Sequence, residues 1–396
     1  MSTNFVEPSN TPLSLLLRGK DTDMLSERGV SCPGEMPAAS DVDLVARATA
    51  AKAKLGKRVF ILGHHYQRDE VIQFADVTGD SFKLAQKAAD SPESEFIIFC
   101  GVHFMAESAD ILTSDKQKVL LPDLQAGCSM ADMASESQVD AAWAEFEKLG
   151  IANDIIPITY MNSTAAIKAF TGRNGGTICT SSNAARAMEW AFAQKTKVFF
   201  LPDQHLGRNT AVLELGLSLE DCVVWDQTKP LGGQTPQSLQ AAKVILWKGH
   251  CSVHGRFTAQ NVIDVRKEIP DVNVLVHPEC KYEVVLQADY VGSTEKIIQL
   301  LQNAPTGSKW AIGTELNLVR RLAQKFPDKH ITYLDKTICY CSTMNRIDLP
   351  HVVWILEAIA DNRIHNVISV DKKVASDAKI ALDRMLALPA TNAPLD

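Results

Sequence analysis

The sequence of 396 residues contains no uninterrupted apolar run of the ~20 residues that are needed to span a bilayer. It also lacks runs of basic residues, because 40 Lys and Arg are mixed along the chain with 47 Asp and Glu. The formal net charge is −7, and binding to nucleic-acid phosphates requires clustered positive charge. We therefore expect a soluble globular protein with neither a membrane nor a nucleic acid as its partner.

The nine cysteines form no CxxC pair, and their number is odd. A structural zinc site normally uses paired Cys or His ligands at short spacing, so the pattern argues against one. Residues 1–7 also lack the positive segment and the apolar segment of a secretory signal. The pattern therefore disfavours a disulfide framework and predicts a reducing, cytoplasmic compartment.

From about residue 46, short apolar runs alternate with segments of helical periodicity. This alternation is typical of βαβ units and parallel sheets that are covered by helices. The pattern recurs three times, and we predict an α/β fold of three pseudo-symmetric small domains around a central active site. The predicted parts are an N-terminal extension at 1–45, domains at 46–135, 136–250 and 251–347, an insertion at about 209–233 in the second domain, and a C-terminal tail at 348–396 that packs back on the first.

One cysteine follows the last apolar run of each repeat: Cys128, Cys251, and either Cys341 or Cys339. The carboxyl ends of parallel strands form the ligand crevice of open α/β sheets, so these thiols are expected at the rims where sites form. Three thiolates leave a fourth coordination position open. On a 4Fe-4S cluster, the free iron acts as a Lewis acid on a substrate oxygen. The role of Cys280 stays open.

Polar side chains gather where the apolar runs end. Residues two apart share a face of an extended chain, which pairs His64 with Tyr66, Tyr160 with Asn162, and His277 with Glu279. Hydroxyl residues precede or begin the helical segments that follow, where free backbone N–H groups bind anions. Ser81 could instead cap its helix. Together these clusters predict one site for a small, anionic, oxygen-rich substrate.

Over about residues 42–360 the chain resembles the quinolinate synthase family (type A), the iron–sulfur enzymes of NAD biosynthesis. The resemblance implies three similar α/β domains around one site, and condensation of iminoaspartate with dihydroxyacetone phosphate to quinolinate, with release of phosphate and water. It also implies cluster ligation by Cys128, Cys251 and Cys341, because Cys341 and Met344 match the family's Cys-x-x-Met context and Cys339 does not. The matching blocks are 63–67, 79–85, 127–131, 159–164, 179–184, 249–254, 277–280, 292–294, 313–315 and 341–344.

The same resemblance implies roles for the remaining site residues. Tyr66, His277 and Glu279 would move protons, and L-aspartate oxidase would be a partner that supplies iminoaspartate. Two other classes of protein stay open, an iron–sulfur redox sensor and a zinc-dependent hydrolase. The residues that the resemblance places against the substrates are His64, Ser81, Tyr160, Asn162, Ser181, His254, His277, Glu279 and Thr294.

Overall fold

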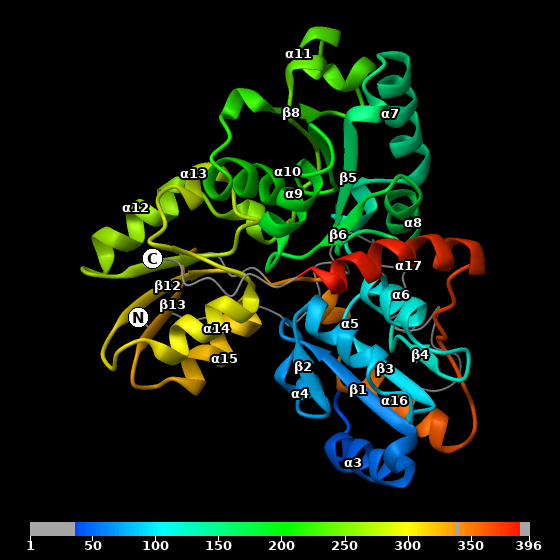
Figure 1. Cartoon of the computed structure of the whole chain (residues 1–396). Helices are drawn as coiled ribbons and strands as arrows, with labels where there is room; N and C mark the ends of the chain where they lie inside the picture. The colour runs from blue at the N-terminus through cyan, green and yellow to red at the C-terminus, as the bar shows by residue number, and fades with distance from the viewer. Residues whose placement is uncertain (1–35, 337–339, 389–396) are drawn as a thin grey trace, which may run out of the picture.

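The computed structural model describes residues 36–336 and 340–388. Three parallel β-sheets, each with its own helices, are arranged around a common centre (Figure 1). No helix in these two ranges is long and apolar enough to cross a membrane. The predicted α/β fold with three small units is confirmed. Cys339 lies outside the described residues.

The first unit is a four-stranded sheet of order β2-β1-β3-β4. Its central strands lie between two layers of helices, which explains why Phe96–Cys100 is a continuous apolar run and buried throughout. The elements are α3 (Leu44–Leu55), β1 (Val59–His64), α4 (Asp69–Ile72), β2 (Val77–Gly79), α5 (Ser81–Ala89), β3 (Phe96–Cys100), α6 (His103–Leu112) and β4 (Lys118–Leu120).

The second unit has five strands in the order β6-β5-β7-β9-β8. The segment at 209–233 that was predicted as an insertion supplies β8, an edge strand parallel to β9. Its Trp225 packs edge-on against Phe146, with ring centroids 5.0 Å apart. The elements are α7 (Glu136–Lys148), β5 (Ile155–Tyr160), α8 (Ala165–Arg173), β6 (Thr177–Cys179), α9 (Ala184–Phe192), β7 (Lys197–Leu201), α10 (Gln204–Asn209), β8 (Cys222–Trp225), α11 (Pro236–Ala241) and β9 (Val244–Trp247).

The third unit repeats the first, with the strand order β11-β10-β12-β13. In every unit the first strand lies between the second and third strands, so the three first strands are equivalent. The elements are α12 (Ala259–Glu268), β10 (Asn273–Val276), α13 (Tyr282–Val285), β11 (Tyr290–Val291), α14 (Thr294–Asn303), β12 (Lys309–Gly313), α15 (Leu316–Lys325) and β13 (His330–Tyr333).

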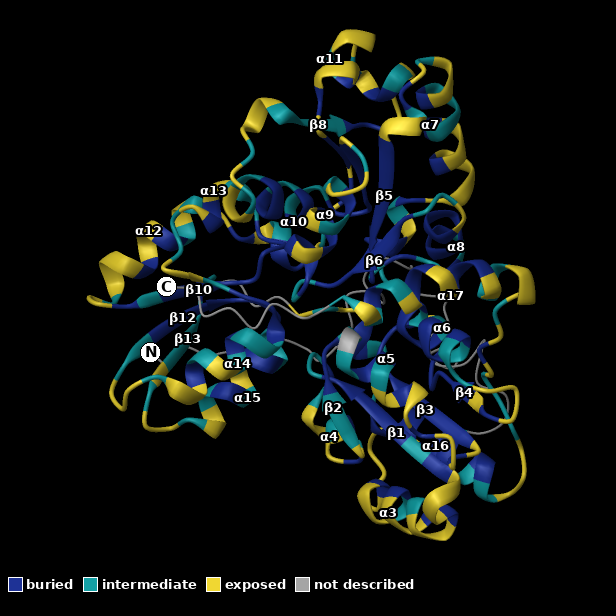
Figure 2. Ribbon diagram, viewed as in Figure 1, coloured by how far each residue is buried: buried dark blue, intermediate teal, exposed yellow. Residues whose placement is uncertain are grey.

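Two helices follow the third unit. Helix α16 (Leu349–Ala360) packs against α3, and Arg47 donates two hydrogen bonds of 2.8 Å to Glu357. Helix α17 (Lys372–Ala387) lies chiefly along α8 of the second unit and also contacts α6 of the first. Figure 2 shows the central strands buried and many exposed residues on outer helices such as α3, α7 and α12, whereas edge strands such as β2, β8 and β13 are only partly buried. The exact domain boundaries stay a prediction.

Candidate active site

A cavity lies at the centre, where the carboxyl ends of the three sheets meet. Every site residue that the sequence singled out lines it, although these residues come from all three units. They are His64, Tyr66, Ser81, Cys128, Tyr160, Asn162, Ser181, Cys251, His254, His277, Glu279, Thr294 and Cys341. The remaining wall is mostly apolar, with Phe104, Met105 and Met344 among its side chains, and also includes Asp80 and Thr180.

The first strand of each unit presents its polar pair at the same place. His64 and Tyr160 are the last residues of β1 and β5, and His277 directly follows β10. Their partners Tyr66, Asn162 and Glu279 lie two residues further along. The extended-chain period of two that the sequence suggested does not apply here, because a turn or bend follows each strand. The turns nevertheless leave both members of each pair lining the cavity. The predicted pairs are therefore equivalent by position, and they differ in their chemistry.

The three cysteine loops also share one geometry. After each cysteine the chain makes a 3₁₀ turn, at Ala131–Met133, His254–Arg256 and Met344–Arg346. The carbonyl of each cysteine accepts a hydrogen bond from the backbone N–H four residues later, at 3.1 Å for Cys128, 2.9 Å for Cys251 and 3.0 Å for Cys341. This shared turn makes Cys341 the equivalent of Cys128 and Cys251.

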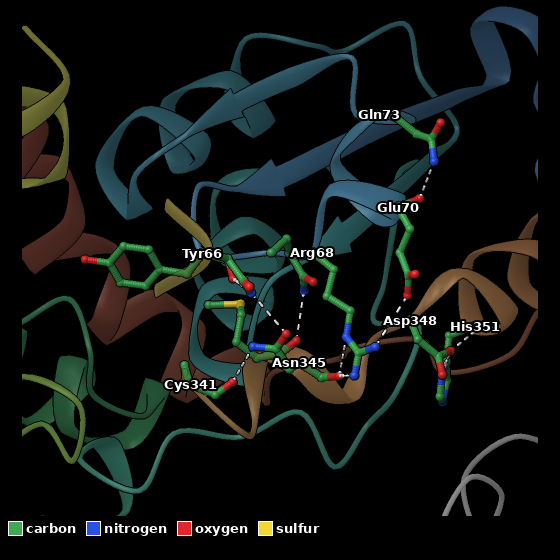
Figure 3. A network of polar contacts seen from close by, with 11 residues as sticks. Tyr66, Arg68, Glu70, Gln73, Cys341, Asn345, Asp348 and His351 are labelled. Atoms are coloured by element: carbon green, nitrogen blue, oxygen red, sulfur yellow. Dashed lines mark hydrogen bonds and ion pairs between the residues drawn. The ribbon is translucent and has the colours of Figure 1, made fainter. Parts of the chain in front are cut away.

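The third cysteine loop is also tied to the first unit, as Figure 3 shows. The Asn345 side chain donates to the Cys341 carbonyl at 2.9 Å and accepts from Asn317 Nδ2 at 3.0 Å. Asn317 donates in turn to the Tyr66 carbonyl at 3.1 Å, while Arg68 donates to the Asn345 carbonyl at 2.8 Å and 3.1 Å. The position of Cys341 is therefore linked to the loop that carries Tyr66.

Three helix N-termini meet at the cavity. Thr294 is the first residue of α14 and Ser81 is the first of α5, whereas Ser181 precedes α9. The N-cap of α5 is Asp80, which accepts from the Lys83 N–H at 3.0 Å, so Ser81 does not cap this helix. Free N–H groups and the helix dipole favour anions at such ends.

Two histidines of the cavity, His64 and His277, have strongly lowered pKa values. Burial lowers the pKa of His64 to about 3, helped by neighbouring His65. Burial likewise lowers the pKa of His277 to about 3, together with His254, whose ring stacks on it at 4.3 Å. A neutral imidazole can both accept a proton and donate one, whereas an imidazolium can only donate. In both rings Nδ1 accepts a backbone N–H, from Tyr66 at 3.2 Å and from Glu279 at 3.3 Å, so each neutral ring carries its proton on Nε2.

Glu279 is one of two acidic residues that line the cavity, and the other is Asp80. Burial alone would raise the pKa of its carboxyl, but His254 and His277 outweigh burial and lower the pKa to about 2. His254 Nδ1 forms a short hydrogen bond with Glu279 Oε2, and both side chains are almost completely buried. The ionised carboxylate thus lies beside two histidine rings.

Tyr66 and His254 are joined through Thr314, a residue that did not stand out among the sequence's polar pairs. The Tyr66 hydroxyl lies 3.0 Å from Thr294 Oγ1 and 2.9 Å from Thr314 Oγ1. Thr314 Oγ1 lies 3.1 Å from His254 Nε2. Thr314 directly follows β12, so the end of a unit's third strand was the signal that could have pointed to it.

The cysteines that line the cavity are free thiols, like the other described cysteines. Burial raises the pKa of Cys128 to about 12 and raises the pKa values of Cys251 and Cys341 as well, and the thiols act on one another. Uncomplexed, they hold their protons, which a metal would displace on binding. Cys280 is buried, does not line this cavity, and donates to the Gly313 carbonyl at 3.6 Å.

Among the described residues, the ligand atoms of Cys251, His254 and Glu279 all lie within 4.8 Å of one another, whereas the three thiols form no such group. Three thiolates on one tetrahedral zinc ion lie about 3.8 Å apart, given Zn–S bonds of about 2.3 Å. The wider spread of the thiols does not match one zinc ion, and it suits a cluster whose irons occupy separate corners.

The fold and cavity together define an α/β protein in which three parallel-sheet units share one polar site that three thiols line. The sequence pattern of the family described as quinolinate synthetase A protein matches residues 47–387. The chain therefore belongs to the quinolinate synthetase A family.

Individual relatives agree with this assignment. A quinolinate synthase of Streptomyces coelicolor is 67% identical over 389 residues, which cover 98% of this chain and 99% of that protein. One of a Nocardioides species is 64% identical over 383 residues, 95% of this chain and 97% of that protein. One of a Geobacillus species is 58% identical over 347 residues, 87% of this chain and 94% of that protein.

Proposed function

We propose that this chain is a quinolinate synthase, which condenses iminoaspartate with dihydroxyacetone phosphate and releases phosphate and water. The observation that carries the proposal is the meeting of three equivalent cysteine loops and three different polar pairs around one cavity. A buried thiol set alone would also suit a redox sensor. A sensor, however, would not require neutral histidines, a carboxylate and two phenols on the same wall.

Cys128, Cys251 and Cys341 are the ligands that we propose for a 4Fe-4S cluster. Support comes from the thiolate chemistry of the donors, their shared turn geometry, and a spread that does not match a single zinc ion. Such a cluster, when bound by three cysteines, supplies a Lewis acid at its fourth iron. The chain's own side chains supply binding and proton transfer around it.

The three helix N-termini suit the charge of the substrates. Iminoaspartate carries two carboxylates and dihydroxyacetone phosphate carries a phosphate group, so the cavity must hold several anionic oxygens. Ser81, Ser181 and Thr294 offer hydroxyl donors beside the N-termini of α5, α9 and α14. Tyr160 and Asn162 add donors from the second unit, and His64 adds a neutral ring from the first. We assign these residues to substrate binding.

Tyr66, His277 and Glu279 are the residues that we assign to proton transfer. Condensation and dehydration require protons to be taken from carbon and nitrogen and given to leaving hydroxyl groups. Glu279 is an ionised carboxylate, and His277 is a neutral ring whose Nδ1 accepts from the Glu279 N–H at 3.3 Å. His254 binds Glu279 and fixes its orientation. Together these groups can accept and return protons without a net redox change.

The supply of iminoaspartate implies a further partner. An imine hydrolyses in water, so a nearby L-aspartate oxidase would limit its loss by delivering it at short range. A cytoplasmic location fits this supply, and the free state of the described cysteines suits a reducing compartment. Both the partner and the compartment are parts of the proposal.

The proposal is tested by purifying the protein without oxygen and restoring its cluster. A broad absorption near roughly 400 nm is expected of thiolate-bound iron. Iminoaspartate and dihydroxyacetone phosphate should then yield quinolinate in proportion to bound iron. Iron-loaded protein that forms no quinolinate would favour the redox sensor, and a colourless protein with tightly bound zinc would favour the hydrolase.

A further inference from the structure

Asn209 is a buried residue of the second unit that binds a loop of the third. It is the last residue of α10 and the first of the segment 209–233 that was predicted as an insertion. Its Nδ2 donates one hydrogen bond of 2.8 Å to the Pro278 carbonyl and a second of 2.8 Å to the Cys280 carbonyl. The two bonds therefore hold the backbone immediately before and immediately after Glu279.

The chemistry of these two contacts fixes the orientation of the Asn209 amide. Both neighbours are carbonyl oxygens, which only accept, so the group between them must be the NH2 end with its two protons. An aspartate has the same size but no proton to donate when it is ionised, and a leucine has no polar group. Of these three side chains of similar size, only asparagine can bind both carbonyls.

Helix α10 is a rigid support for Asn209. The side chain of Asp203 caps its first turn and accepts two backbone N–H groups, at 2.6 Å and 3.1 Å. At Gly207 the helix lies so close to β9 that a Cβ atom would come 2.6 Å from a Leu246 side-chain atom. Side chains on such packed elements are placed more precisely than side chains on loops. Asn209 can therefore act as a fixed point for the loop that it binds.

The loop at 277–280 is tight, and its internal bonds fix its shape only. The Cys280 N–H donates to the His277 carbonyl at 3.0 Å, and the Glu279 N–H donates to His277 Nδ1 at 3.3 Å. Both bonds lie within the loop, so they do not set its place relative to the second unit. The two bonds from Asn209 cross between the units and do set it.

The corresponding loop of the first unit is held in the same way. Arg321 donates to the His65 carbonyl at 2.8 Å and to the Gln67 carbonyl at 2.6 Å, on either side of Tyr66. Arg321 lies on α15, which follows the third strand of its unit as α10 follows the third strand of the second. In both cases a neighbouring unit binds the carbonyls before and after a residue that we assign to proton transfer.

The loop of the second unit is held from within its own unit. The Ser163 carbonyl accepts from Lys168 at 2.5 Å, and both residues belong to the second unit. The central residue of this loop is Asn162, which we assign to substrate binding. Binding of a loop by donors of another unit thus accompanies Tyr66 and Glu279, whose groups must be aimed at a reacting atom.

We propose that Asn209 is a positioning residue that fixes the Glu279 carboxylate in the cavity by binding the backbone on both sides of it. The inference rests on the proposed quinolinate synthase function, in which Glu279 moves protons. Asn209 does not line the cavity, so its effect on a substrate is exerted through Glu279. A displacement of a reacting group by about 1 Å can lower a rate about 10²-fold, which sets the scale of the expected effect.

The first test compares Asn209→Leu with Asn174→Leu in the cluster-loaded protein. Asn209→Leu should lower kcat per bound iron roughly 10–10²-fold and leave KM within about threefold of wild type. Asn174→Leu is the matched control, because it removes an amide that donates to the Phe170 carbonyl at 2.9 Å, away from the cavity, and it should keep the wild-type kcat. Thermal melting and iron content show whether each variant folds and loads.

A smaller variant keeps the test possible if Asn209→Leu does not fold. Asn209→Ser leaves space rather than crowding the site, and its single short donor cannot bind both carbonyls. Its kcat should fall about tenfold, again with KM largely kept.

Two further measurements separate positioning from a merely structural role. Asn209→Leu added to Glu279→Gln should lower kcat by less than about threefold further, because Asn209 acts only through the carboxylate. Hydrogen exchange of the purified protein without substrates should be about tenfold faster at the backbone amides of 277–282 in Asn209→Leu than in wild type or Asn174→Leu.

Certain results would overturn the inference. A folded, iron-loaded Asn209 variant with a kcat within about threefold of wild type would do so, as would equal losses in the wild-type and Glu279→Gln backgrounds. Unchanged hydrogen exchange at 277–282 would also count against it. Wild-type protein that makes no quinolinate would instead refute the proposed function. The exchange measurement needs no activity, so the two failures remain distinguishable.

Discussion

The cysteine loops and the first-strand ends each occur three times, but the three loops are alike whereas the three strand ends carry different residues. The loops at Cys128, Cys251 and Cys341 share the residue type, the 3₁₀ turn and the hydrogen bond to the cysteine carbonyl. The first-strand ends share their position only, because one carries His and Tyr, one carries Tyr and Asn, and one carries His and Glu.

Under the proposed function, this difference separates the residues that would hold a metal group from those that would act on substrates. A cluster with three similar corners is held well by three similar loops, whereas two dissimilar anionic substrates need different contacts on each side. The repeat therefore supplies the scaffold, and the departures from it supply the chemistry.

The largest effect is expected at the repeated feature. Cys128→Ser, Cys251→Ser and Cys341→Ser should each abolish both the bound iron and quinolinate formation, because a hydroxyl is a poor ligand for a thiolate-bound cluster. Iron content, visible absorption and activity measure the outcome. Cys280→Ser is the matched control, since that thiol is buried away from the cavity and should leave all three unchanged. If one cavity cysteine proved dispensable, the equivalence of the loops would fail.

A smaller effect, on chemistry alone, is expected at a differing feature. Glu279→Gln keeps the shape of the side chain but not its charge, so kcat should fall roughly 10²–10⁴-fold while iron content stays at the wild-type level. Steady-state rates beside iron analysis measure this. If Glu279→Gln lost as much iron as the cysteine variants, the first-strand ends would also be needed for iron binding, and the proposed separation of their role from that of the cysteine loops would be wrong.

Asn162 of the second unit holds the position equivalent to Glu279 and provides an uncharged contrast to it. Asn162 offers hydrogen bonds and no charge, so Asn162→Ala should chiefly weaken binding. A lost hydrogen bond of about 1–1.5 kcal/mol corresponds to a roughly fivefold to tenfold higher KM with kcat largely kept. Titration of each substrate in turn would show which one Asn162 contacts. An unchanged KM with a lowered kcat would place Asn162 among the proton-transfer residues instead.

An effect of similar size, on iron affinity rather than substrate binding, should reveal how the third loop differs from the other two. Asn345→Ala removes the side-chain bonds to Cys341 and Asn317 and should lower iron affinity about tenfold, the lower end for residues that orient a ligand. Competition with a chelator measures it. Asp132→Ala is the control, because Asp132 holds the same place after Cys128 and its side chain is exposed. Equal losses of iron affinity in both variants would show that the Asn345 side-chain bonds have no special role in holding the third loop.

These residues also show which parts of the fold and the site could be predicted from the sequence. Apolar runs and helical periods predicted the three sheets because those patterns are local, and the polar strand ends predicted the site because parallel strands gather their carboxyl ends. Thr314 and Asn345 were not singled out, since each has a partner in the first unit that lies more than 200 residues away along the chain, Tyr66 for Thr314 and Arg68 for Asn345. The choice of Cys341 over Cys339 rested on family context, and only the folded turn shows its equivalence to the other two cysteines.

Helix α8 of the second unit departs from the repeat in a way that affects stability. The helix after the first strand has four residues in the first and third units, whereas α8 has nine and carries Lys168. Lys168 is completely buried, donates to the Ser163 carbonyl at 2.5 Å, and lies 5.3 Å from the centre of the Phe104 ring in the first unit. Burial lowers the pKa of this amine to about 8.

Because the folded pKa of Lys168 lies below the unfolded one, the unfolded chain binds more protons between the two values, and the free energy of unfolding should rise with pH in that window. The whole contribution is on the order of 3 kcal/mol. Urea unfolding at about pH 8 and about pH 10, in reductant, should therefore show a smaller rise for Lys168→Met than for wild type. Lys54→Met, at an exposed position of α3, should retain the full rise. If the free energy of unfolding rose equally with pH in wild type and Lys168→Met, the pKa of Lys168 would not be lowered by burial. The longer α8 would then have no electrostatic effect on stability.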